Sequence, residues 1–175
     1  MRKLMFSLLA STFLAGAAFA QNAAAPAGAP QNPPPPPARG PGLDLAIEAA
    51  RTALAEAKAG DQKVAVTVID SAGVIKLVLV SDGTGPRAVQ NSNFKAQAAL
   101  AFKEPSGQLA EEIKTNKELA DKIAANPNYL PRAGAILLKV NDEVIGAIGV
   151  GGARGSDKDE AYAKAGLAKI ESQLK

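Results

Sequence analysis

Residues 133–150 read AGAILLKVNDEVIGAIGV, and this stretch decides the fold. Residues 133–140 and 143–150 are apolar runs of strand length, and the dipeptide Asn141-Asp142 between them is typical of a tight turn. A two-residue connection joins antiparallel strands. The stretch therefore predicts a β-hairpin.

A second hairpin precedes it in the chain. Residues 64–69 and 74–80 are rich in Val, Ile and Leu, and the turn Asp70-Ser71-Ala72-Gly73 separates them. Both strands are apolar on both faces, which is expected of a sheet covered on both sides.

Helical patterns surround the two hairpins. Leu43, Ile47, Ala50 and Leu54 recur at helical spacing before the first hairpin, and Gly60 ends that helix. Between the hairpins we expect a helix over residues 86–103 and two short helices, one of them opened by a Thr115-x-x-Glu118 capping box. A last helix begins near Ser156.

The resulting order is αββ, helices, ββα. No alternating βαβ pattern is present, so the sheet is not expected to be parallel. We predict one α+β domain over residues 43–175, with an antiparallel sheet of two hairpins packed between helices.

The first twenty residues are typical of a cleavable signal peptide. Arg2 and Lys3 precede an apolar stretch over residues 4–17, and Ala18-Phe19-Ala20 matches the small-x-small cleavage pattern. Gln21 is the expected mature N-terminus, and the mature protein is expected in the periplasm or secreted. No later stretch is apolar enough to span a membrane.

Residues 21–42 are rich in Ala, Pro and Gly and include five consecutive prolines, residues 33–37. They lack the apolar content needed to offset the entropy of ordering. We interpret them as a disordered tether with a polyproline II segment.

Composition excludes several kinds of function. The 20 basic residues less Arg2 and Lys3 stand against 17 acidic ones, so the mature net charge is +1 and gives no case for nucleic acid binding. The chain has no His and no Cys, and both Met residues lie in the signal peptide. Zinc sites and imidazole-based triads are therefore excluded, and we assign no catalytic and no metal-binding residue.

Candidate ligand-binding residues lie on the helix of residues 86–103. Phe94 and Phe102 are eight residues apart and share a helix face, so they form either core or one wall of an apolar pocket. Lys95 lies beside Phe94 and could pair with a ligand carboxylate. Arg87 and Arg132 could bind carboxylates in a forked manner or remain solvated.

Glycines form the third group of candidates. Gly146 and Gly149 leave bare backbone in a strand, against which either a flat ligand or a helix can lie. The Gly-rich loop that follows, residues 151–155, resembles a phosphate cradle, but its spacing fits neither a dinucleotide fingerprint nor a P-loop.

These motifs together resemble the GlcG/HbpS family of haem-binding-type proteins. The resemblance rests on residues 142–150 (DEVIGAIGV) with the Gly-rich turn and Asp157-x-Asp159 after it, on residues 66–73 (VTVIDSAG), and on Phe94-Lys95-Ala96. It covers residues 43–175 almost entirely. Departures from the family pattern are Ala98, the turn Asn141-Asp142 and residues 130–133 (LPRA).

The resemblance implies a homo-oligomeric protein that binds a small molecule, namely haem or a related tetrapyrrole as cofactor. Because the mature chain lacks His, Met and Cys, Tyr129 in the loop before the third strand is the expected oxygen ligand, ahead of Tyr162 in the last helix. Two alternatives stay open: a structural, partner-binding subunit, and an enzyme that uses carboxylates or Lys, for which Asp70 is the residue to inspect.

Overall fold

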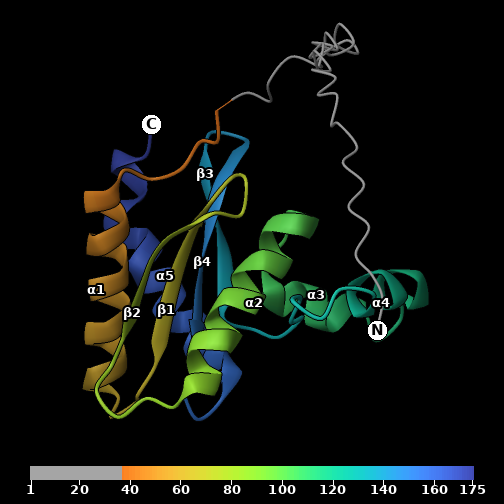
Figure 1. Ribbon diagram of the computed structural model, residues 1–175, viewed down its shortest axis with the longest axis horizontal. Coiled ribbons are helices and arrows are strands. Elements are labelled where there is room, and N and C mark those ends of the chain that lie inside the picture. The colour runs from red at the N-terminus through yellow and green to blue at the C-terminus, as the bar shows by residue number, and fades with distance from the viewer. Residues whose placement is uncertain (1–36) are drawn as a thin grey trace, which may run out of the picture. The chain divides into compact units, whose positions relative to one another are not determined.

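A computed structural model of the protein describes residues 37–175. The predicted signal peptide and most of the predicted tether lie outside these residues. The helices and strands follow the predicted order (Figure 1): α1 Leu43–Ala59, β1 Ala65–Asp70, β2 Ile75–Val80, α2 Pro86–Phe102, α3 Ser106–Glu112, α4 Lys117–Ala124, β3 Ala135–Val140, β4 Glu143–Gly151, α5 Ser156–Ile170 and a 3₁₀ turn Glu171–Gln173.

The predicted α+β fold is confirmed. The four strands form one antiparallel sheet in the order β2-β1-β4-β3, so each hairpin supplies one central and one edge strand. The two hairpins meet where β1 pairs with β4, with Val68 opposite Ile148. This pairing places Gly149 and Gly146 in the middle of the sheet.

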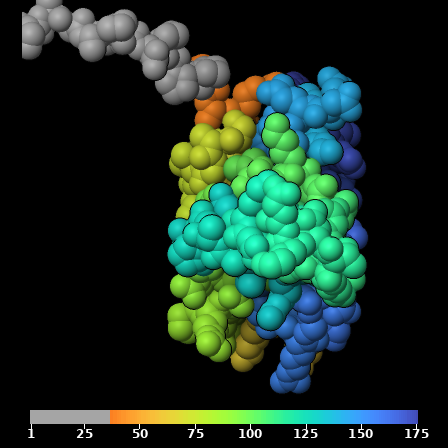
Figure 2. All heavy atoms as spheres, turned by 90° about the vertical axis from the view of Figure 1, so that its right-hand side faces the viewer, coloured from red at the N-terminus to blue at the C-terminus, as the bar shows by residue number. Residues whose placement is uncertain are grey.

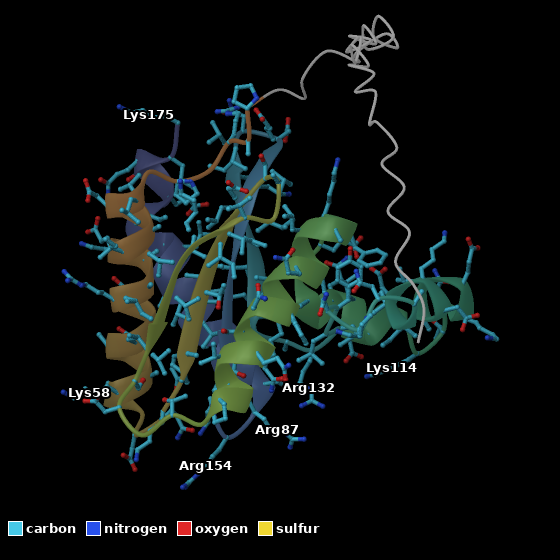
Figure 3. The ribbon with its side chains drawn as sticks, in the orientation of Figure 1. Lys58, Arg87, Lys114, Arg132, Arg154 and Lys175 are labelled. Carbon is cyan, nitrogen blue, oxygen red and sulfur yellow. The ribbon has the colours of Figure 1, made fainter. Side chains whose placement is uncertain are left out.

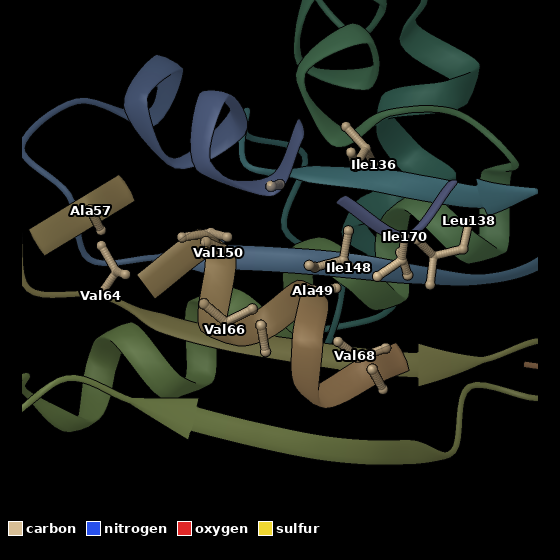
Figure 4. Close-up of a cluster of buried hydrophobic side chains, with 14 of the residues drawn as sticks. Ala49, Ala57, Val64, Val66, Val68, Ile136, Leu138, Ile148, Val150 and Ile170 are labelled. Atoms are coloured by element: carbon tan, nitrogen blue, oxygen red, sulfur yellow. The ribbon is translucent and has the colours of Figure 1, made fainter. Parts of the chain in front are cut away.

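Helices cover both faces of β1, β4 and β3. The expectation of a sheet covered on both sides is wrong for the edge strand β2, which packs against α1 on one face and leaves Ile75 and Val80 exposed. Helices α1 and α5 lie together on one face, and α2 crosses the other over β1, β4 and β3 (Figure 1). The main core is formed between α1, α5 and the sheet, where Val66, Val68, Ile148 and Val150 are fully buried (Figure 4). Alanines form the buried stripe of α1, so α1 approaches its neighbours closely: Ala46, Ala49, Ala50, Ala53 and Ala57.

Helices α3 and α4 lie apart from the main core. We call residues 104–133 the arm (Figure 1). The arm has its own small apolar cluster, in which Leu109 and Ile123 are buried against Ala98 and Phe102 of α2. The predicted capping box at Thr115 is wrong by one residue: Asn116 caps α4, and its Oδ1 accepts a hydrogen bond of 3.0 Å from the Leu119 N–H. An Asn side chain at the N-cap, like a Thr side chain, accepts a hydrogen bond from a first-turn backbone N–H that has no partner within the helix.

The chain enters the domain across the tips of the hairpins. The Arg39 N–H donates to Ser71 Oγ at 2.8 Å, the Ser71 N–H donates back to the Arg39 carbonyl at 2.8 Å, and the Arg39 guanidinium pairs with Glu143. Backbone pairing with the domain therefore begins at Arg39, ahead of the predicted domain start at residue 43. No helix within residues 37–175 is both long and apolar enough to cross a membrane.

Candidate functional site

An open cavity of about 440 Å³ lies between the β1–β2 turn and the C-terminal half of α2. Leu100 and Gln97 of α2 form one wall, and Gly73 in the turn forms another. Val144 at the start of β4 and Tyr129 from the arm complete it. The volume falls in the range of ligand-binding clefts. We call this cavity the Tyr129 pocket.

Fixed contacts shape the pocket wall. Gln97 Nε2 donates a hydrogen bond of 2.8 Å to the Gly73 carbonyl, which holds the turn against α2. Gly73 has φ +76, a conformation that favours glycine. A Cβ on Gly73 would lie 2.9 Å from Gln97 Oε1, so a larger residue would also displace the Gln97 amide that holds the turn.

Tyr129 is held by an aromatic contact behind the pocket. Its ring meets that of Phe102 edge to face, with centroids 5.6 Å apart and planes at 79°. Such contacts stabilise by about 0.5–1.5 kcal/mol beyond the area buried. The Tyr129 backbone N–H donates to the Asn126 carbonyl at 3.1 Å. Ring and backbone are therefore both positioned, and Tyr129 takes part in the pocket wall.

Lys103 adds one positive charge to the pocket. It is exposed and follows the last residue of α2 in the left-handed conformation, with φ 56. The pocket thus combines aliphatic and aromatic surface, a phenol and an ammonium group. This combination suits a flat, apolar molecule that carries a carboxylate.

The remaining aromatic and arginine candidates do not line this pocket. Phe102 lies behind Tyr129 in the arm cluster, and Phe94 is half-buried elsewhere on α2. Arg87 borders a different cavity at the N-terminal end of α2, and Arg132 is exposed on the arm. Figure 3 labels both arginines away from the hairpin turn. Of these candidates, Phe102 and Tyr129 are in direct aromatic contact.

Lys95 is not accessible to a ligand. Its side chain is 2% exposed, and Nζ donates to Asp159 Oδ2 at 2.6 Å and to the Val150 carbonyl at 3.1 Å. Gly134 packs so closely that a Cβ there would lie 2.5 Å from Nζ. The expected role of Lys95 in pairing a ligand carboxylate is therefore wrong for this conformation, because its charge is already paired within the fold.

The Lys95–Asp159 pair joins three parts of the domain. It links α2 to α5, and the second oxygen of Asp159 accepts a hydrogen bond of 2.9 Å from the Ala153 N–H in the Gly-rich loop. Burial lowers the pKa of Lys95 and raises the pKa of Asp159, and in each case the partner's charge opposes the shift. The Gly-rich loop therefore binds the Asp159 carboxylate of its own chain. The ion pair with Lys95 accounts for the presence of an acidic residue at this buried position.

The candidate residues Gly149 and Gly146 pack against backbone atoms of neighbouring elements. A Cβ on Gly149 would collide with the Ser92 carbonyl of α2, and one on Gly146 would collide with the Ile69 carbonyl of β1. Close packing of the chain therefore accounts for both, and neither borders the Tyr129 pocket. Asp70 is likewise structural, since its Oδ1 accepts hydrogen bonds from the Ala72 and Val74 N–H groups at 2.9 and 3.0 Å.

Gln97, Leu100 and Lys103 are pocket residues that sequence reasoning missed. Gln97 and Leu100 lie one turn apart on one stripe of α2, and Lys103 follows directly after the helix. This spacing was visible in the sequence, but it does not reveal which part of the chain lies opposite the stripe. Among residues 37–175 no group of three or more His, Cys, Asp or Glu residues could hold a metal ion.

Comparison with known proteins agrees with this architecture. Residues 42–168 match the family model of the haem degrading protein HbpS-like family. HbpS from Streptomyces reticuli, solved as a double mutant, is 32% identical, with 83% of this chain and 97% of that chain covered and a TM-score of 0.70.

Two more distant structures share the fold. Protein ORFY from Klebsiella pneumoniae is 22% identical over 78% of this chain and 94% of its own, with a TM-score of 0.71. PduOC, solved as a haem complex, is 17% identical over 75% of this chain and 95% of its own, with a TM-score of 0.69.

No curated protein matches the sequence. The matched region nevertheless begins at the start of α1 and extends through most of α5. The chain belongs to the HbpS-like family of haem degrading proteins.

Proposed function

We propose that this chain is an exported protein that binds haem or a related tetrapyrrole in the Tyr129 pocket. The observation that carries the proposal is the pocket itself, which presents a phenol and an ammonium group beside aliphatic walls. Family membership supports the class of ligand. The related PduOC was solved with haem, which fits the same class.

The donor set supports oxygen ligation of the iron. Residues 21–175 contain no His, Cys or Met, so the strongest common haem ligands are missing from the mature chain. Tyr129 is the phenol that lines the pocket, whereas Tyr162 packs against the main core in α5. A tyrosinate ligates haem iron in some haem proteins. In this proposal Tyr129 is the iron ligand and Lys103 pairs with a propionate.

Titration of the full mature chain with hemin tests these two roles. Tyr129→Phe should remove the spectral signature of a phenolate ligand, and Tyr162→Phe should leave it unchanged. Lys103→Ala should weaken hemin binding by about ten-fold, since a charge-assisted pair contributes about 1.5 kcal/mol at the low end. Lys122→Ala, which removes an exposed lysine paired with Glu118 on α4, is the matched control.

Spectra and affinities that are the same for the wild type, Tyr129→Phe and Lys103→Ala would remove both residues from the site. Hemin binding that depends on Tyr162 instead would move the site to the other face of the sheet.

We further propose that the mature chain begins at Gln21, works in the periplasm or outside the cell, and self-associates. The helices are rich in alanine, and small side chains bury little area each, so a shared interface would add stability. Native mass spectrometry of the exported protein tests both points, with an expected N-terminus at Gln21 and a mass that is a multiple of one chain. A monomer that retains Met1 would contradict both.

A further inference from the structure

Strand β2 is the least covered strand of the sheet. It lies at one edge, and among the helices and strands of residues 37–175 it has extensive contact only with β1 and α1. Val74 just before the strand, Ile75 at its start and Val80 at its end are 58%, 47% and 44% exposed. Three of the four exposed large apolar side chains of the described residues therefore gather at this one edge.

The opposite edge of the sheet is better protected. Helices α2 and α5 both pack against β3, α3 also contacts it, and none of the exposed large apolar side chains of residues 37–175 lies on it. In Figure 2 the arm occupies the middle of the face turned to the viewer, and the yellow residues around the β1–β2 turn lie outside it. An uncovered edge strand presents backbone groups that can pair with another strand. Strand β2 is therefore the edge at which the sheet can be extended.

Charges of both signs border the exposed end of β2. An open cavity of about 380 Å³ lies between α1 and this end of the strand, and Leu54 and Val80 supply apolar surface to it. Its rim includes Lys63, Asp61 and Asp82, and none of these three groups belongs to an ion pair within residues 37–175. An apolar centre within a polar, charged rim is the usual anatomy of a protein–protein interface.

One further charge lies within the strand itself. Lys76 is exposed and lies at a β-bulge, where β2 uses the three residues Ile75 to Leu77 and β1 uses two. A lysine and a bulge on an edge strand discourage indiscriminate pairing with other strands. Lys76 and Asp82 are both exposed and lie on either side of the strand's apolar residues. In an antiparallel pair of two β2 strands, each lysine can therefore lie opposite the aspartate of the other copy.

This register also brings apolar residues together. With Lys76 opposite Asp82, antiparallel pairing places Val78 opposite Val80 and Leu79 on the two-fold axis. Val78 and Leu79 are half-buried in the single chain and Val80 is exposed, so a second copy would cover apolar surface that the fold leaves open. Because the axis relates the two copies, each of the off-axis contacts occurs twice. A shift of the register would remove both lysines from their places opposite the aspartates.

A second copy of the chain is the occupant that these features favour. A two-fold interface uses the same surface on both sides, so this surface must carry both signs of charge, as the β2 edge does with Lys76 and Asp82. A strongly charged partner would instead be matched by a surface of one sign. The Pro-rich residues 33–37 of the chain itself cannot extend the sheet, because proline has no N–H to donate.

We propose that β2 pairs antiparallel with β2 of a second copy about a two-fold axis, which makes one continuous sheet with four strands from each copy. The inference rests on the proposed function only in taking the chain to self-associate, and it is independent of haem. In this dimer Lys76 of each copy pairs with Asp82 of the other. These two pairs fix the register of the apolar contacts between them.

Charge exchange between copies of the full mature chain tests this pairing. Lys76→Asp alone and Asp82→Lys alone each place like charges opposite each other twice, so each should weaken self-association by about ten-fold. An equimolar mixture of the two variants should recover the wild-type affinity, because the mixed dimer again has a lysine opposite an aspartate at both positions. Sedimentation equilibrium of each variant and of the mixture measures the three dissociation constants. A mixture that associates no better than the separate variants would overturn the proposed register.

Val80→Asp should dissociate the β2 dimer, because it places a charge in the apolar centre of the interface. Leu43→Asp is the matched control, since Leu43 is 54% exposed at the start of α1, and it should keep the dimer. A wild-type chain that is monomeric at micromolar concentration would overturn the proposal together with self-association, and would leave the β2 edge to residues 21–36 or to another protein. An assembly that every variant keeps would overturn the β2 interface alone. Neither result affects the hemin titration.

Discussion

Lys95→Met should lower the free energy of unfolding by about 3–5 kcal/mol at neutral pH, because it leaves the buried charge of Asp159 without a partner. The native ammonium lies 2.6 Å from Asp159 Oδ2, and both side chains are at most 4% exposed. Methionine preserves most of the length of the side chain and none of its charge. Urea unfolding followed by far-UV circular dichroism measures the loss.

The double variant Lys95→Met/Asp159→Asn should lose much less stability than the single variant. Removing both charges removes the unpaired one, and the amide oxygen of the introduced asparagine can still accept the hydrogen bond from the Ala153 N–H. The exposed pair Lys122–Glu118 supplies the control, since Lys122→Met should cost less than about 1 kcal/mol.

The dependence on pH has a definite sign. In Lys95→Met the pKa of Asp159 remains raised by burial, and the lysine that opposed this shift is gone. A raised carboxyl pKa stabilises the fold at low pH, and this stabilisation is lost as pH rises through it. The difference in unfolding free energy between the wild type and Lys95→Met should therefore become smaller at acidic pH. If Lys95→Met lowered the free energy of unfolding by less than about 1 kcal/mol at pH 7, as for an exposed pair, the Lys95–Asp159 pair would not stabilise the fold as proposed.

Gly149→Val should destabilise the domain by about 3 kcal/mol or more, because overpacking at a rigid contact forces backbone shifts. A Cβ at Gly149 would collide with the Ser92 carbonyl and lie 3.0 Å from the Ala96 Cβ, so α2 would have to lift off the sheet. The same urea titration measures the effect. Displacement of α2 should also disturb the Tyr129 pocket, since α2 supplies one of its walls.

Gly85→Ala is the matched control for this steric argument. Gly85 precedes α2 with φ −75, and a Cβ there would meet nothing within 4 Å. Because Gly85 is the N-cap of α2, its effect should stay near 1 kcal/mol or less, the cost typical of alanine at an N-cap. A Gly149→Val variant with the stability of Gly85→Ala would show that α2 does not lie against β4.

Much of this fold was predictable because local patterns determine it. The Asn141-Asp142 turn requires an antiparallel hairpin, and the apolar runs on either side of it form β3 and β4. The alternatives left open at Gly149 and Gly146 were a flat ligand and a helix. Helix α2 lies against Gly149, whereas Gly146 lies against the Ile69 carbonyl of β1, which neither alternative named. What could not be predicted was the pairing of β1 with β4, since it joins two hairpins that lie far apart in the sequence.

The candidate site was predictable only in part. Tyr129 was identified because residues 21–175 lack His, Cys and Met. The prediction that Lys95 faces a ligand was wrong because its partner Asp159 lies 64 residues away in the sequence. No local pattern indicates a buried ion pair over such a separation. The cap of α4 was misplaced by one residue because Thr115 and Asn116 are both good N-cap residues and adjacent in sequence.

Absorption and electron paramagnetic resonance spectra of the full mature wild-type chain during a hemin titration test the central claim most directly. The account predicts saturable binding and a spectrum without the low-spin signature of two nitrogen ligands, since His is absent from the chain. Tyr129→Phe should change that spectrum, and Tyr162→Phe should not. No saturable binding, or a tight low-spin complex in the wild type, would contradict the assignment of the Tyr129 pocket as a haem site.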